Sequence, residues 1–336
     1  MSGIRFVCVV LLCTGGLAIC IACSESKVAL DAKFEKQRQS LLDEGVRKHE
    51  IRGVSAAIVF PDGTVWTGVG GVSHDTVPMK PDMLFGIGSV TKNFVAALTL
   101  LLAEEGALSL DDPISDYLPA YPHVDGDITI RQLLNHTSGL YMFWDNDDLW
   151  EALKEDRSKV WTPEEVLAYI EEPYFEPGEG WRYSNTNYLL LAMIIEETTG
   201  NKLSTEFRNR FWVPLGIDAY LAIQETVPKN RAHVFGDNFQ FGEQEMDLTF
   251  EPRASHDSIG FGSSGICMTA EELARWCQAL YTGKILNKES MDEMLQFVKF
   301  RPVSATRLQY ESLWLGRAEI PTRFFQLAGS HRAWRW

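Results

Sequence analysis

Apolar residues dominate two short segments near the beginning of the chain, residues 55–60 and 64–69. Pro61-Asp62-Gly63 lies between them, and a turn sequence between two such segments is typical of a β-hairpin. Before the hairpin, the charged residues 28–52 place their apolar positions at mostly helical spacing. The pattern therefore predicts one helix followed by two antiparallel strands.

Helical patterns dominate the middle of the chain. An apolar helix is expected over residues 89–105, where Gly106 ends it, and another over residues 188–199, before Gly200. Three further helix starts carry capping sequences, at Thr129, Thr162 and Thr269. The chain is therefore expected to be mostly helical from the first of these helices to about Trp276.

Strand patterns return only near the end of the sequence, around residues 314–320 and 324–327. Strands, then helices, then strands predict an α+β fold, in which helices flank an antiparallel sheet and a helical insertion separates two parts of that sheet. No linker is long enough to divide domains, so residues 24–336 are expected to form one domain.

Composition and charge narrow the class of protein. The 336 residues are 45% hydrophobic and carry a formal net charge of -15. This hydrophobic content suits a globular protein with a sizeable core. The negative charge argues against a nucleic-acid partner and against electrostatic docking on anionic lipid.

The histidines show no spacing typical of a metal site, and no Cys/His cluster lies outside the N-terminal apolar segment, so neither a metal nor a cofactor is expected. Cys277 lies about two turns into the helix that Thr269 starts, which is too far from Cys267 for a disulfide. Both are expected to be free thiols.

The first residues have the pattern of a secretory leader. Arg5 precedes an apolar run over residues 6–22, and Ile21-Ala22 precedes Cys23 as in a bacterial lipobox. We expect residues 1–23 to be a signal peptide and Cys23 to be lipidated. The protein would then be an exported, membrane-anchored lipoprotein that faces the periplasm or the cell exterior. An ordinary cleaved signal and a retained anchor are the alternatives, although the run is short for a membrane span.

Two short motifs carry the candidate chemistry. Ser89 and Lys92 lie three residues apart at a predicted helix start, so they share a helical face, and a neighbouring amine can accept the proton of a serine nucleophile. Apolar neighbours would bury Lys92 and disfavour its charged form. The helix N-terminus would stabilise negative charge near Ser89. Tyr183 could act as a base or proton relay with a pKa lowered by a neighbouring ammonium, and the Asn185 amide could orient a substrate carbonyl.

Neither motif is decisive alone. The pattern S-x-x-K also occurs from Ser24 to Lys27, and an ordinary helix start with a surface lysine has the same letters. Tyr-x-Asn occurs only at Tyr183, but taken alone this stretch and the preceding residues 176–178 favour a simple turn.

The order of the motifs resembles the class C branch of the serine β-lactamase-related family, which also contains DD-peptidases and serine esterases. The similarity runs from about residue 53 to about residue 280. Its segments are residues 85–92, 106–114, 131–140, 177–185, 214–216 and 264–269. The resemblance implies a β-lactamase/transpeptidase-like fold with Ser89 as nucleophile, Lys92 as its partner, Tyr183 as general base and Asn185 as substrate-orienting amide. It also implies that the backbone N–H of Ser89 forms half of an oxyanion hole.

The third motif of that family, Lys-Thr-Gly or His-x-Gly on a strand, has no direct match here. The remaining candidate is the segment 329–334, in which His331 would fill the slot, Ala333 replaces the glycine and Trp334 would supply the second oxyanion N–H. The alternative is an altered tail without such a role. Family members continue for further strands, so the C-terminal strands are expected to be missing and the domain to be truncated.

The resemblance implies a serine hydrolase that works through an acyl-enzyme on amide, β-lactam or ester carbonyls. Its substrate would be a small molecule or a peptidoglycan peptide. A carboxylesterase of the same fold and a catalytically inactive penicillin-binding-like protein remain the alternatives, because the motifs are shared among them.

Overall fold

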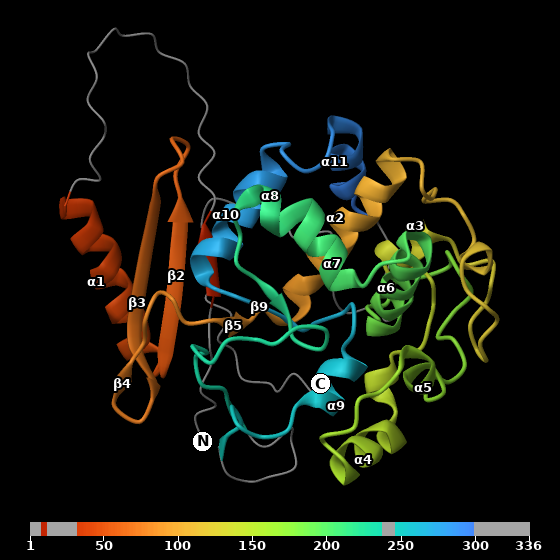
Figure 1. Ribbon diagram of the computed structural model, residues 1–336, viewed down its shortest axis with the longest axis horizontal. Coiled ribbons are helices and arrows are strands. Elements are labelled where there is room, and N and C mark those ends of the chain that lie inside the picture. Colours follow the sequence, from red (N-terminus) through yellow and green to blue (C-terminus); the bar gives the residue numbers. More distant parts are fainter. Residues whose placement is uncertain (1–7, 12–31, 237–245, 299–336) are drawn as a thin grey trace, which may run out of the picture. The chain divides into compact units, whose positions relative to one another are not determined.

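The computed structural model describes residues 8–11, 32–236 and 246–298 (Figure 1). The chain divides into two compact units, each built from several stretches of sequence. The strand-rich unit comprises Met1–Ile87, Arg210–Glu251 and Ile266–Lys284, and the helical unit comprises Gly88–Asn209, Pro252–Gly265 and Ile285–Trp336.

Strands and flanking helices make up the strand-rich unit. Its elements are β1 (Cys8–Leu11), α1 (Ala32–Lys48), β2 (Gly53–Val59), β3 (Val65–His74), β4 (Val77–Pro78), β5 (Phe85–Gly86), α8 (Val213–Leu215), β6 (Tyr220–Leu221), β7 (Phe235–Gly236), β8 (Met246–Asp247), β9 (Ile266–Met268) and α10 (Ala270–Tyr281). The first four strands form one sheet in the order β1-β2-β3-β4, in which β1 is parallel to β2 and the other pairs are antiparallel. The predicted helix and hairpin are therefore confirmed as α1, β2 and β3.

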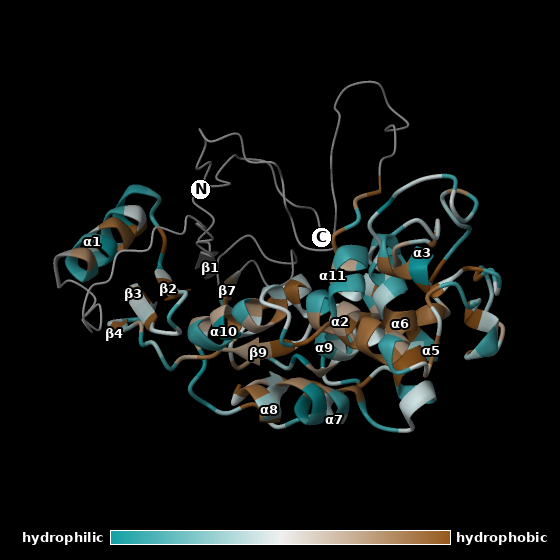
Figure 2. Cartoon of the chain, turned by 90° about the horizontal axis from the view of Figure 1, so that it is seen from above, coloured by the Kyte–Doolittle hydropathy of each residue, from teal (hydrophilic) through white to brown (hydrophobic). Residues whose placement is uncertain are grey.

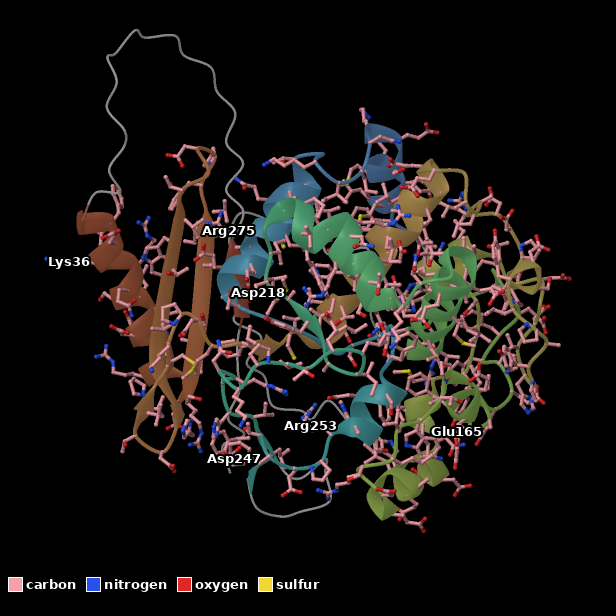
Figure 3. All side chains as sticks on the ribbon, viewed as in Figure 1. Lys36, Glu165, Asp218, Asp247, Arg253 and Arg275 are labelled. Carbon is pink, nitrogen blue, oxygen red and sulfur yellow. The ribbon has the colours of Figure 1, made fainter. Side chains whose placement is uncertain are left out.

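Helices cover both faces of the β2–β3 hairpin (Figure 1). Ala57 on one face packs with Ala274 of α10. On the opposite face α1 approaches so closely that a Cβ at Gly70 would lie 3.1 Å from a methyl group of Val46. The exposed Lys36 projects from α1 away from the strands (Figure 3). Alternation along a strand thus sends successive residues to two different helices, which explains why β2 is buried along nearly its whole length.

A second sheet joins distant short strands in the order β5-β9-β6, with both pairs antiparallel. The prediction that strands return only near the C-terminus is therefore wrong, since β6, β7, β8 and β9 all lie in the region expected to be mostly helical. Each has only two or three residues, which is too short to show a period-two pattern. The segments 314–320 and 324–327 lie outside the described residues.

Helices make up the described part of the helical unit. Its elements are η1 (Gly88–Val90), α2 (Thr91–Glu104), η2 (Ile114–Asp116), α3 (Ile130–Leu134), η3 (Phe143–Asp145), α4 (Asp147–Glu155), α5 (Pro163–Leu167), α6 (Asn185–Thr199), α7 (Leu203–Phe207), α9 (Ala254–Ile259) and α11 (Lys288–Met294). The π-helical turn η4 (Arg208–Trp212) leads from α7 to α8.

The expected capping boxes at Thr129 and Thr269 are confirmed, and the expected cap at Thr162 is a capping box as well. At α5, for example, Thr162 Oγ1 accepts the N–H of Glu165, and the Glu165 carboxylate accepts the N–H of Thr162. Glu165 is among the acidic side chains labelled in Figure 3. Cys267 and Cys277 form no disulfide, as predicted.

Helices α2 and α6 pack together in the core of the helical unit. The first is buried from Thr91 to Leu100 and the second from Asn185 to Ile195. Both are largely apolar over these stretches (Figure 2), as expected for helices that are covered on all sides. Polar residues are nevertheless buried at their N-terminal ends, among them Lys92 and Asn185, and the burial of these two requires another explanation.

Candidate active site

Three predicted catalytic side chains meet at the N-terminal ends of α2 and α6. Ser89 is exposed in the turn η1, directly before α2. Its Oγ lies 2.9 Å from the Tyr183 hydroxyl and 3.3 Å from Lys92 Nζ. The structure thus places two potential proton-transfer groups on one accessible serine hydroxyl.

Lys92 lies in the first turn of α2 and is only 3% exposed. Its amine donates a hydrogen bond to the backbone carbonyl of Ser263, with an Nζ–O distance of 2.8 Å. Burial lowers the pKa of Lys92 well below its ordinary value, because the charged ammonium loses its hydration. This agrees with the sequence-based expectation. A neutral amine beside Ser89 keeps a lone pair that can accept the serine proton.

The phenol of Tyr183 behaves differently from the prediction. Burial raises the pKa of Tyr183 to about 12, and the hydrogen bond to Ser89 opposes this only in part. The expected lowering by a neighbouring ammonium is wrong, because burial favours the neutral amine of Lys92, although Nζ lies 4.9 Å from the centre of the phenol ring. Tyr183 therefore carries its proton at neutral pH, and its hydroxyl is suited to donate a proton first.

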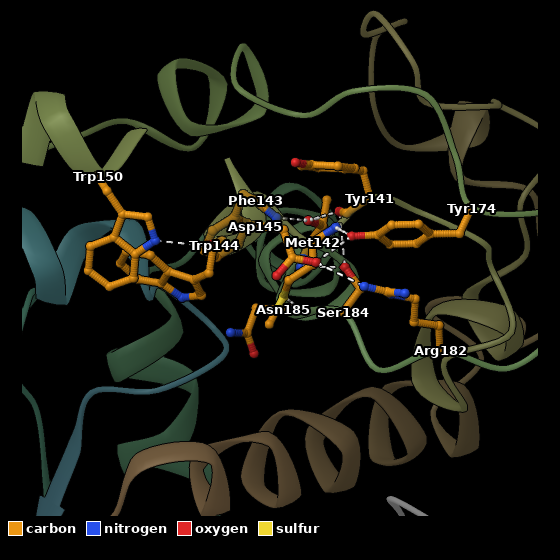
Figure 4. Close-up of polar contacts among 11 residues, drawn as sticks. Tyr141, Met142, Phe143, Trp144, Asp145, Trp150, Tyr174, Arg182, Ser184 and Asn185 are labelled. Atoms are coloured by element: carbon orange, nitrogen blue, oxygen red, sulfur yellow. Dashed lines mark hydrogen bonds and ion pairs between the residues drawn. The ribbon is translucent and has the colours of Figure 1, made fainter. Parts of the chain in front are cut away.

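Asn185 begins α6 and is 4% exposed. Its backbone N–H donates to the sulfur of Met142. In the described part of the chain, the side-chain Oδ1 is buried without a hydrogen-bond partner. In Figure 4 the amide group lies clear of the dashed contacts around Ser184. A buried acceptor without a partner can be satisfied by an N–H group of a ligand.

A polar network fixes the N-terminal end of α6 against residues 141–145 (Figure 4). The carbonyl of Tyr141 accepts hydrogen bonds from the hydroxyls of Ser184 and Thr186. Asp145 accepts hydrogen bonds from the Tyr174 hydroxyl and from the Arg182 guanidinium. These contacts hold the backbone on both sides of Tyr183.

Ser263 was missed by the sequence analysis because its role is carried by a backbone carbonyl, which leaves no side-chain signature. It lies in a glycine-rich turn, residues 260–265, before β9. Gly262 in this turn has φ +71°, and a Cβ there would lie 2.3 Å from the carbonyl oxygen of Tyr188. Only glycine fits this close approach of the turn to α6.

Gly262→Ala is expected to destabilise the protein by at least about 2 kcal/mol, because it adds a backbone clash to the strain of a left-handed conformation. It should also slow any reaction of Ser89, since the displaced turn carries the Ser263 carbonyl. Gly200→Ala is the matched control, because Gly200 has φ +67° with nothing within 4 Å of an added Cβ. Thermal unfolding and Ser89 labelling are the measurements. Equal loss of stability in the two variants would contradict the clash.

The remaining predicted residues cannot be placed. Cys23, His331 and Trp334 lie outside the described residues, so lipidation and the third motif stay predictions. Within the described ranges, no group of three or more histidine, cysteine, aspartate or glutamate side chains could hold a metal ion. None of the helices in the described part of the chain combines the length and the apolar character needed to cross a bilayer.

Comparison with known proteins adds independent evidence. Penicillin-binding protein 4* of Bacillus subtilis (strain 168) is 29% identical over 278 residues, which cover 79% of this chain and 60% of that protein. The chain spans about 60% of the length of the curated relatives that it matches first.

The fold resembles that of solved structures, among them those of an amidohydrolase and an amidase. The D-stereospecific amidohydrolase from Streptomyces sp. superposes with a TM-score of 0.68 and 28% identity, over 79% of this chain and 78% of that one. The D-amino acid amidase from Ochrobactrum anthropi SV3, in complex with L-phenylalanine, superposes with a TM-score of 0.65 and 30% identity, over 75% of this chain and 71% of that one.

These likenesses confirm the α+β, β-lactamase/transpeptidase-like fold and the resemblance on which the sequence analysis relied. The model of the beta-lactamase family matches residues 38–333, which is most of the sequence. The chain therefore belongs to the beta-lactamase family.

Proposed function

We propose that this protein is a serine hydrolase that forms an acyl-enzyme on Ser89 with an amide or β-lactam carbonyl. The observation that carries the proposal is the position of the Ser89 hydroxyl, within reach of both Lys92 Nζ and the Tyr183 hydroxyl. The related proteins point the same way, since they include a penicillin-binding protein, a D-stereospecific amidohydrolase and a D-amino acid amidase. The substrate would be a small molecule or a peptidoglycan peptide.

Protonation states suggest how the proposed reaction proceeds. Neutral Lys92 takes the proton of Ser89 as Oγ forms a bond to the substrate carbonyl carbon. The backbone N–H of Ser89 stabilises the resulting oxyanion. Tyr183 then donates its proton to the leaving nitrogen as the C–N bond breaks, and the Lys92 ammonium returns a proton to the phenolate. Water hydrolyses the ester by the same groups in reverse order.

This assignment differs from the general-base role that the family resemblance implies for Tyr183. It follows from burial, because burial disfavours both the ammonium and the phenolate. A neutral amine is a proton acceptor and a neutral phenol is a proton donor, so the two groups have complementary tasks.

The test is to incubate the protein with a fluorescent penicillin and to map the adduct by peptide mass spectrometry. We expect the added mass on the peptide that contains Ser89, and none in Ser89→Ala. An adduct that persists undiminished in Ser89→Ala would refute the proposal. Turnover of nitrocefin, a D-phenylalanine anilide and a p-nitrophenyl ester then separates the activities. An adduct without any turnover would indicate an inactive penicillin-binding protein, and turnover of the ester alone would indicate a carboxylesterase.

The proposal extends to location. The leader pattern and the lipobox support an exported lipoprotein anchored through Cys23. Wild-type protein should then partition with membranes and carry lipid, whereas Cys23→Ser should not. Identical soluble, unmodified protein from both would contradict the anchor. A membrane-bound Cys23→Ser would instead indicate a retained span.

A further inference from the structure

His136 is a buried titratable residue for which the proposed reaction has no use. It is fully buried, and its φ of +62° is unusual for a residue other than glycine. Its Nε2 has no hydrogen-bond partner in the part of the chain that the structure describes. Both features cost stability, and strained or unsatisfied buried groups concentrate at functional sites.

The polar contacts of His136 converge on the two residues that flank Tyr183. Its carbonyl oxygen accepts the N–H of Arg182 at 3.1 Å, and its Nδ1 accepts the N–H of Ser184 at 3.2 Å. Asn187 Nδ2 donates to the same Nδ1 at 3.0 Å. A backbone N–H can only donate, so Nδ1 carries no proton and the imidazole is neutral with its proton on Nε2.

The imidazole also contacts the catalytic ring itself. The ring centroids of His136 and Tyr183 are 4.7 Å apart, and the two planes are tilted by 32°. Burial lowers the pKa of His136 well below its ordinary value. The imidazole therefore keeps its role as acceptor at neutral pH.

Residues 137–139, which follow His136, are held in place without the His136 side chain. The carbonyl of Thr137 accepts the N–H of Gly178, and the carbonyl of Gly139 accepts the N–H of Tyr174, both at 2.8 Å. These backbone contacts hold residues 174–178, which precede Arg182, independently of the imidazole. The hydrogen bonds from Ser184 and Asn187, and the ring contacts with Trp181, Tyr183 and Tyr188, depend on the His136 side chain.

We infer that His136 is a positioning residue that holds the Tyr183 hydroxyl against Ser89 Oγ. The inference rests on the proposed acylation of Ser89. It is carried by the hydrogen bond from the Ser184 N–H to Nδ1 and by the ring contact with Tyr183. Catalysis is sensitive to such placement, since a shift of about 1 Å can cost on the order of 10²-fold in rate.

A double-mutant cycle tests whether His136 acts through Tyr183. His136→Ala is expected to lower the rate of Ser89 acylation by a fluorescent penicillin about 10²-fold, with noncovalent binding changed little. In a Tyr183→Phe background the same substitution should cost no more than about 3-fold, because the group that it positions is absent. His136→Asn should recover most of the rate. Its Oδ1 occupies the place of Nδ1, and asparagine tolerates a positive φ.

Thr99→Val is the matched control for a general loss of stability. It removes a buried hydrogen bond to the Val95 carbonyl within α2, at a residue that is likewise fully buried. It should lower the melting temperature and leave acylation unchanged. If His136→Ala does not fold, His136→Gln replaces it in the cycle. The side-chain oxygen of glutamine lies one bond farther from the backbone than Nδ1 of histidine, so it cannot take the place of Nδ1.

The outcomes separate the inference from the proposed function. Equal rate losses from His136→Ala in the wild-type and Tyr183→Phe backgrounds would overturn the positioning role while leaving Ser89 acylation intact. Wild-type acylation in His136→Ala would overturn it as well. If the wild-type protein forms no adduct on Ser89, both the inference and the proposed function fail.

Discussion

Lys92→Met is expected to lower the rate of Ser89 acylation on the order of 10³- to 10⁴-fold while the protein remains folded. Methionine fills a similar volume in the buried environment of Lys92, but it has no amine to take the proton of Ser89. Stopped-flow measurement of acylation by a fluorescent penicillin gives the rate, and circular dichroism checks the fold. Lys288→Met is the control, because that side chain is 86% exposed.

The pH dependence of the acylation rate tests whether the pKa of Lys92 is lowered. The pKa of Lys92 in the folded protein lies well below its ordinary value of 10.5. The reactive neutral amine therefore forms as pH rises through this lowered pKa, so acylation should increase over that range and stay level as pH approaches 10.5. An acylation rate that keeps rising until about pH 10.5 would contradict a buried, neutral Lys92.

Tyr183→Phe should have the second largest effect, and this effect should depend on the leaving group. We expect acylation by an amide or a β-lactam to fall on the order of 10²- to 10³-fold, because the departing nitrogen loses its proton donor. Acylation by a p-nitrophenyl ester should fall far less, since nitrophenolate leaves without protonation. The two rates, measured on the same preparation, give the result directly.

Equal losses for both substrate types would contradict the donor role of Tyr183 and would instead favour its action as the base for Ser89. Tyr117→Phe is a suitable control. It also removes a phenol hydroxyl with a hydrogen-bond partner, the carboxylate of Asp112, from the helical unit. Its acylation rates should match those of wild type with both substrates.

Local patterns predicted those parts of the fold that depend on nearby residues. The hairpin of β2 and β3 follows from a turn sequence between two apolar segments. The capping boxes at Thr129, Thr162 and Thr269 each need only four residues. The pairing of β5 with β9 could not be found in this way. It joins Phe85 to Met268, and neither strand is long enough to reveal its period.

The sequence predicted those parts of the candidate site that are formed by side chains in recognisable motifs. Ser89 and Lys92 lie within one helical turn, and the order of motifs along the chain indicated Tyr183, although it is 94 residues away from Ser89. The carbonyl of Ser263 and the contacts of His136 have no such signature, because they depend on how distant segments pack. The state of Tyr183 was mispredicted for a related reason: burial outweighed the neighbouring lysine, and only the folded structure shows how deeply both groups are buried.

The N-terminal ends of two buried helices adjoin the reacting groups, since Ser89 lies in η1, directly before α2, and Tyr183 directly precedes Ser184, the N-cap of α6. Such ends attract anions, but only within about one turn. At longer range the net charge of -15 repels them. Salt weakens this long-range repulsion, with a Debye length of about 8 Å at physiological ionic strength, and affects the partly buried helix ends much less. A carboxylate-bearing substrate such as a penicillin should therefore associate faster as ionic strength rises, the opposite of the usual behaviour of an enzyme that steers its substrate by charge.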